Sequence, residues 1–136
     1  MILALLDNVM WHVLSGPHAR FASGGPTAKR YAPEMAEIAG RFFDRRWIDA
    51  PIRPGKSPGA FAHPTVPSAH PYILLNYQGK PRDVMTLAHE LGHGVHAALG
   101  GRQGLFHMAT PLTLAETASV FGETIVFGRL LERAET

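Results

Sequence analysis

Five consecutive residues carry the most specific chemical pattern in this sequence. They are His89-Glu90-Leu91-Gly92-His93, with two imidazoles four positions apart. Residues i and i+4 are neighbours on one face of an α-helix, so both rings can reach a single Zn²⁺. Glu90 would lie on the flank of that face, where its carboxylate can hold a metal-bound water and accept its proton. The pattern predicts a catalytic metal site with His89 and His93 as ligands and Glu90 as the base.

A tetrahedral catalytic zinc site needs a third protein ligand, and Glu116 is the candidate. It follows His93 in the chain and lies near the start of the next expected helix. The alternative is that Thr113 and Glu116 form a capping box that only stabilises the helix start. His96 is a rival third ligand, but the outer histidines of one straight helix would be about 10 Å apart along its axis. We therefore predict Glu116 as the ligand, and assign His96 either to packing or to a place beside the ligands or the substrate.

Ser119 and Glu123 follow Glu116 on the same side of the last expected helix. Either side chain could accept the free ring N–H of a ligand histidine and so fix its tautomer. The alternatives are a solvated Glu123 and a Ser119 with no role in the site. His107 lies in an expected loop, in contact with either substrate or solvent. The remaining histidines have no ligand spacing and are interpreted as incidental: His12, His18, His63 and His70.

Two helices and a strand are expected to position these residues. An apolar stripe predicts a helix over residues 82–99, ended by two glycines. Gly92 and Gly94 are poor helix residues, which indicates that another element or the substrate approaches closely there. A last helix is predicted over residues 111–134, and a strand over residues 72–77.

The rest of the chain completes a fold that is mainly α with a small β element (α+β). A short amphipathic helix is predicted over residues 2–14, followed by a glycine- and proline-rich loop over residues 16–32. Pro33 is expected in the first turn of another helix that ends at about Trp47. Six prolines predict an extended, irregular segment over residues 49–71.

The composition limits the class of protein. A length of 136 residues suits one compact domain, and a net charge of +2 does not indicate a nucleic-acid partner. The chain has no Cys, which excludes a disulfide scaffold and a thiolate metal site. No segment has the length of a membrane span, and the N-terminal residues do not have the pattern of a signal peptide. We therefore expect a cytoplasmic protein without membrane contact.

Four segments in order resemble oligoendopeptidase F, a bacterial member of the thimet-oligopeptidase-like zinc metallopeptidases. They are residues 53–61, 73–77, 83–96 and 110–123. The resemblance implies one zinc ion bound by His89, His93 and Glu116, with Glu90 as the catalytic base. It also implies a mostly helical, zincin-like domain that cleaves short peptides inside a channel. An edge strand beside the metal helix would pair with the substrate backbone, and residues 72–77 are the expected match.

Members of that family are several times longer than this chain, and a later segment with His and Tyr stabilises the oxyanion in them. We therefore expect residues 31–136 to be part of a zincin-like catalytic domain, preceded by a helix and linker in residues 1–30. The expected function is zinc-dependent hydrolysis of oligopeptides, present here as a catalytic-core fragment. The alternatives are a zinc- or peptide-binding fragment without turnover, or a helical fragment completed by a partner chain. Self-association through exposed apolar helix faces is also expected.

Overall fold

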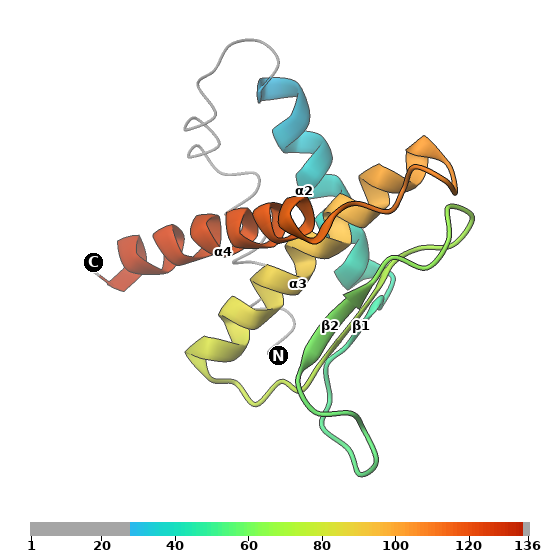
Figure 1. Ribbon diagram of the computed structural model, residues 1–136. Coiled ribbons are helices and arrows are strands. Elements are labelled where there is room, and N and C mark those ends of the chain that lie inside the picture. The colour runs from blue at the N-terminus through green and yellow to red at the C-terminus, as the bar shows by residue number, and fades with distance from the viewer. Residues whose placement is uncertain (1–27, 135–136) are drawn as a thin grey trace.

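The computed structural model describes residues 28–134, and Figure 1 shows their arrangement. Helices account for most of these residues, and a small sheet accounts for the rest of the regular structure. This confirms the predicted mainly helical fold with a small β element. The predicted helix over residues 2–14 lies outside the described residues. In chain order the elements are α2 (Ala28–Asp44), β1 (Ile48–Asp49), β2 (Ala60–His63), β3 (Tyr72–Leu75), α3 (Pro81–Gly100), the 3-10 helix η2 (Gly101–Gln103) and α4 (Leu112–Ala134).

Helix α2 differs from its prediction at both ends. It begins at Ala28 and ends at Asp44, so Pro33 lies inside it and Trp47 lies beyond it. The expected loop over residues 16–32 is therefore wrong for its last residues, while residues 16–27 lie outside the described part. The fixed φ of proline is compatible with a helix. Within a helix, proline destabilises it only by removing one backbone hydrogen bond and by crowding the preceding turn. A proline therefore does not have to mark the first turn of a helix.

The small sheet has three strands in the order β1-β3-β2. Strand β3 pairs in parallel with β1 and antiparallel with β2, so it is central in the sheet. The strand predicted over residues 72–77 is confirmed for Tyr72–Leu75, but the expectation that it is an edge strand is wrong. The free edge beside the antiparallel pair belongs to β2, which lies within the segment that we expected to be irregular. The strand takes up four of the five residues between Pro58 and Pro64.

Helix α3 crosses the centre of the described structure, between the sheet and α4 (Figure 1). The apolar stripe predicted for this helix is confirmed, because Leu87, Leu91 and Val95 are buried. Gly94 faces α2, and a Cβ at this position would lie 2.6 Å from Cζ of Phe42. The absence of a side chain at Gly94 therefore lets α2 pack against α3. The core also takes in residues of α2, β3 and α4: Ile38, Ala39, Phe42, Ile73, Leu75 and Val126.

Helices α3 and α4 cross with their backbones in contact. A Cβ on Gly92 would lie 2.6 Å from the carbonyl oxygen of Ala118, and a Cβ on Gly122 would lie 2.7 Å from that of Ala88. Each glycine therefore lies directly against the backbone of the other helix, where no larger residue fits. The close approach predicted from Gly92 is confirmed, and the approaching element is α4.

A buried lysine joins the ends of two strands. The Lys56 side chain is 2% exposed, and its Nζ donates to the carbonyl oxygens of Asp49 (2.8 Å), Pro51 (2.9 Å) and Leu75 (2.8 Å). The Asp49 carboxylate lies 3.2 Å from the same Nζ and accepts two hydrogen bonds from Arg53. These contacts, with the hydrogen bonds from Arg53 as the main cause, lower the pKa of Asp49 to about 2.

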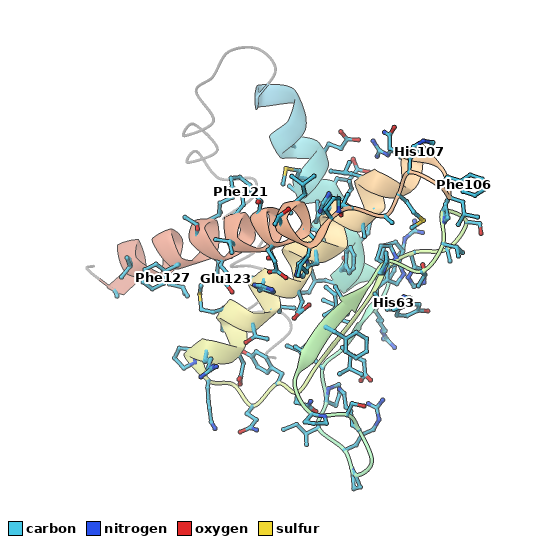
Figure 2. The ribbon with its side chains drawn as sticks, in the orientation of Figure 1. His63, Phe106, His107, Phe121, Glu123 and Phe127 are labelled. Atoms are coloured by element: carbon cyan, nitrogen blue, oxygen red, sulfur yellow. The ribbon has the colours of Figure 1, made fainter. Side chains whose placement is uncertain are left out.

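Helix α4 carries a broad apolar surface that the other described residues do not cover. The predicted exposed apolar face is thus present on this helix, where the side chains of Phe121 and Phe127 (labelled in Figure 2) are each 52% exposed. No helix within residues 28–134 combines the length and apolar character needed to cross a membrane. The large apolar side chains exposed on α4 are Leu112, Leu114, Val120, Phe121, Phe127 and Leu131.

The first prediction concerns the contact between α3 and α4. Gly92→Ala and Gly122→Ala should each lower the free energy of unfolding by about 1–3 kcal/mol, because the obstructing atoms are backbone atoms that cannot rotate away. Gly128→Ala is the matched control, since a Cβ there meets nothing within 4 Å. It should be neutral or stabilising by up to about 1 kcal/mol. Urea unfolding of the three variants measures this, and equal stabilities would contradict the close contact.

The second prediction concerns pH. A folded-state pKa of about 2, below the ordinary aspartate value of 3.8, means that Asp49 adds stability at neutral pH. That contribution is lost as pH falls from about 3.8 to about 2, where the carboxylate becomes protonated in the folded state as well. Asp49→Asn should therefore be less stable than the wild type at pH 7, with a difference that shrinks below pH 4. Thermal unfolding over this range tests it, with Asp44→Asn as an exposed control; a constant difference would contradict it.

Candidate metal centre

The start of α3 is fixed by local signals. Pro81 occupies the first turn, and the Asp83 carboxylate accepts hydrogen bonds from the backbone amides of Gln78 (2.8 Å) and Lys80 (3.0 Å). These bonds lower the pKa of Asp83, so the charge remains near the positive end of the helix dipole. These signals fix the first residue of α3. With the apolar stripe of this helix packed in the core, His89 and His93 face α4.

The structure brings together the three residues predicted as metal ligands. One ligand atom from each of His89, His93 and Glu116 lies within 4.8 Å of the other two. The Nε2 atom of His89 is 3.4 Å from Oε2 of Glu116, and Nε2 of His93 is 3.7 Å from Oε1. The two imidazoles are 4.8 Å apart between ring centroids and nearly perpendicular. Two nitrogen donors and one carboxylate thus converge on one point between α3 and α4.

This donor set fits a zinc ion. Donor atoms at about 2.0–2.1 Å from a tetrahedral Zn²⁺ lie about 3.3 Å from one another, close to the two nitrogen–oxygen separations in the cluster. Two imidazoles and a carboxylate are the ligands of many catalytic zinc sites, which keep a fourth position for water or substrate. The side chains of His89, His93 and Glu116 are 27%, 20% and 44% exposed, so solvent reaches the cluster.

Helix α4 begins at Leu112 and places Glu116 clear of its first turn. The carbonyl oxygen of Pro111 accepts hydrogen bonds from the backbone amides of Leu114 (3.0 Å) and Ala115 (3.1 Å), and these bonds form the first turn of the helix. The Glu116 carboxylate faces the two imidazoles of α3. The geometry therefore favours the interpretation of Glu116 as a ligand over the capping box with Thr113.

Groups on α4 also contact the outer sides of both histidines. Nδ1 of His89 is 3.0 Å from Oε1 of Glu123, which lies at the crossing of α3 and α4 (Figure 2). The backbone of Ala115 lies close enough to His93 to raise the pKa of its ring. Ser119 does not accept a histidine N–H; its hydroxyl is directed at Glu116. Of the two acceptors considered from the sequence, the structure selects Glu123, which fixes the ring orientation of His89.

The environment of His93 favours the neutral form of its ring. Burial is the largest cause of the lowered pKa of His93, and the nearby His89 lowers it further. The negative charge of Glu116 acts in the opposite direction but does not reverse the shift. A neutral imidazole has a free lone pair, which is the form that a metal ion binds.

Glu90 lies buried next to the cluster, on the side of the sheet. It is 7% exposed, and burial is the main cause that raises the pKa of its carboxyl group. The neighbouring His89 and a hydrogen bond from the backbone of Ala62 act against this rise. A partly desolvated carboxylate with a raised pKa is suited to accept a proton near neutral pH.

Sequence reasoning missed the part played by β2. Ala62 belongs to this strand, which packs against α3, so its backbone places β2 next to Glu90. The available signal was the stretch from Ala60 to His63, which has no proline and is bounded by Pro58 and Pro64. The alternation of half-buried and exposed residues in this stretch is that of a strand.

The other histidines that the structure describes lie outside the cluster, whereas His12 and His18 lie outside the described residues. His96 lines an apolar groove of about 160 Å³ between α2, α3 and α4, together with residues such as Leu91 and Phe121. It is thus not a third ligand within the described residues. His107 is exposed in the loop between α3 and α4, well away from the crossing where Glu123 lies (Figure 2).

The fold and the site define a class of protein. A helix with the His-Glu-x-x-His pattern, facing a glutamate on the next helix and packed beside a small sheet, is the arrangement of a zincin-like metallopeptidase. A family model described as peptidase family M3 matches residues 25–135. The chain therefore belongs to peptidase family M3, which confirms the resemblance stated from the sequence.

The relatives are much longer than this chain. The chromosomal oligoendopeptidase F of Lactococcus lactis subsp. cremoris is 33% identical over 105 residues, which cover 76% of this chain and 17% of that protein. An oligoendopeptidase F homolog of Borreliella burgdorferi is 39% identical over 89 residues, 64% of this chain and 15% of its own length. A crystal structure from Chlamydophila abortus, described as a peptidase, superposes with a TM-score of 0.76 at 26% identity, over 96% of this chain and 20% of that one. The chain thus spans 15% to 20% of the length of these proteins.

The third prediction concerns the contact between Glu123 and His89. Glu123→Gln should weaken zinc binding about 10- to 100-fold, because the neutral amide holds the imidazole less firmly and makes it less basic. Glu37→Gln is the matched control, since Glu37 is exposed on α2 and pairs with Arg41. Competition with a chromophoric chelator measures both dissociation constants. Equal zinc affinities of the two variants would contradict the role of Glu123.

Proposed function

We propose that this chain carries the zinc centre of a metalloendopeptidase that hydrolyses peptide bonds of oligopeptides. The observation that supports this most directly is the convergence of His89, His93 and Glu116 within 4.8 Å, with the buried Glu90 beside them. In the proposal the two imidazoles and the Glu116 carboxylate hold one Zn²⁺. Membership of peptidase family M3 and the oligoendopeptidase F relatives support the same reaction.

Glu90 is the proton carrier in this proposal. A bound Zn²⁺ polarises the scissile carbonyl and acidifies a water molecule. The Glu90 carboxylate accepts the proton of the attacking water and delivers it to the nitrogen of the leaving amine, so the carboxylate is regenerated. The burial that raises its pKa makes it a better proton acceptor, and the Ala62 backbone fixes its orientation.

The free edge of β2 is the proposed binding site for the substrate backbone. Within the described residues this strand pairs only with β3, so its other edge is available for an extended peptide. Because the Ala62 backbone contacts Glu90, a peptide paired with β2 would run past the base and the metal ligands. This replaces the expected pairing with residues 72–77, whose backbone is already paired on both sides.

A second candidate function is binding of zinc or peptide without turnover. The exposed apolar side chains of α4, among them Phe121 and Phe127, favour it, because such a surface is usually covered by polypeptide in a working enzyme. Under this candidate the metal site forms, but cleavage requires a partner chain or a second copy on α4.

The fourth prediction separates these functions. The wild type should bind one zinc per chain and cleave a quenched fluorescent oligopeptide. Glu90→Gln should keep the zinc and lose at least about 100-fold in cleavage rate, because only the proton acceptor is removed. His93→Ala should lose both zinc and cleavage.

Metal analysis and fluorescence on the same preparations give both readouts. Zinc at one per chain with no cleavage dependent on Glu90 would support the second candidate. A wild type without stoichiometric zinc would contradict both candidates.

A further inference from the structure

Ser119 is the most completely buried polar residue next to the metal centre. Its exposed fraction is 0%, and its Oγ lies 2.9 Å from the backbone carbonyl oxygen of Glu116 and 2.9 Å from Oε2 of the Glu116 side chain. A serine hydroxyl has one hydrogen, so these two acceptors of one residue share a single donor. Both possible hydrogen bonds therefore connect Ser119 to Glu116.

Other hydroxyl groups of α4 behave differently. Thr117 and Thr124 each donate to the carbonyl oxygen four residues earlier, at 2.8 Å, and both are exposed. Such bonds are common for hydroxyl side chains within helices and involve no other side chain. Ser119 differs because it is buried and reaches a carboxylate that faces His89 and His93.

The contact restricts how the Glu116 carboxylate can turn. Ser119 holds Oε2, while Oε1 lies 3.7 Å from Nε2 of His93. The Glu116 side chain is 44% exposed, so without this bond it would sample several rotamers in solvent. Ordering a long flexible side chain on ligand binding costs conformational entropy, and a carboxylate already held in place avoids much of that cost.

We propose that Ser119 is a positioning residue for the metal centre, which orients Glu116 for the ion before the ion binds. This inference rests on the proposed zinc site and adds to it a residue outside the ligand set. Ser119 touches neither the ion nor the substrate in this proposal. It acts only through Glu116, and this restriction makes the proposal testable.

The fifth prediction is that Ser119→Ala weakens zinc binding about 10-fold or more, as loss of a group that orients a ligand does in other metal sites. Alanine is smaller and a better helix former than serine, so the variant should fold, which its thermal unfolding without metal verifies. Thr117→Ala is the matched control: it removes a hydroxyl group of the same helix that bonds only to a backbone carbonyl. Its zinc affinity should stay within about twofold of the wild type.

A double-mutant cycle with Glu116→Ala identifies the path of the effect. If Ser119 acts through Glu116, Ser119→Ala should leave zinc affinity unchanged in the Glu116→Ala background. An equal loss in both backgrounds would overturn the proposal, as would a wild-type affinity of the single variant. Both of those outcomes leave the zinc site itself intact, whereas a wild type that binds no zinc would overturn the proposed function.

Discussion

The contact between the backbones of α3 and α4 is the constraint on which the other features depend. Gly92 and Gly122 lie on opposite helices, and each faces a carbonyl oxygen of the other, at 2.6 Å and 2.7 Å from where a Cβ would be. The contact is thus reciprocal, and neither helix can move closer or accept a larger residue at this point. The donor atoms of His89 and Glu116 come from different helices, so their separation of 3.4 Å is set by this contact. The glycines, which weaken a helix in isolation, determine the dimensions of the metal centre.

The site is built on two packed helices, beside the hydrophobic core, rather than on a loop. On one face of α3, Leu87 and Leu91 pack against the core, and Glu90 is directed toward β2. Each buried polar group at the crossing has a named partner: the Ala62 backbone for Glu90, and Glu116 for Ser119. A buried polar group without a partner would cost about 1–3 kcal/mol, so these contacts connect the stability of the fold with the geometry of the ligands. Rigid elements carry all three proposed ligands, which favours a site formed before metal arrives.

The parts of the fold that could be predicted are those with local causes. Helix α3 has a proline at its start, two glycines at its end and a regular stripe between them, and its predicted bounds were nearly correct. Strand β2 was missed because its local signal, a proline-free stretch from Ala60 to His63, is short. Its pairing with β3 also joins residues far apart in the chain, such as Phe61 and Leu74. The partner of His89 stayed open for a related reason: the choice between Ser119 and Glu123 depends on how α4 is placed along α3. The buried Lys56 also had no local signal, because its acceptors are backbone carbonyls of two strands and a loop.

His89 contacts α4 through both nitrogens of its ring. Nε2 faces Glu116 and Nδ1 faces Glu123, and these two glutamates are separated by about two helical turns, or about 10.5 Å along the axis of α4. A translation of α4 along its axis lengthens one of these contacts as it shortens the other. The two contact distances of the His89 ring therefore depend on the position of the whole helix along its axis. Any molecule that binds the exposed apolar face of α4 and shifts the helix lengthwise would therefore change the positions of the proposed metal ligands. Helix α4 thus both contributes residues to the proposed metal centre and, when it moves, alters the geometry of that centre.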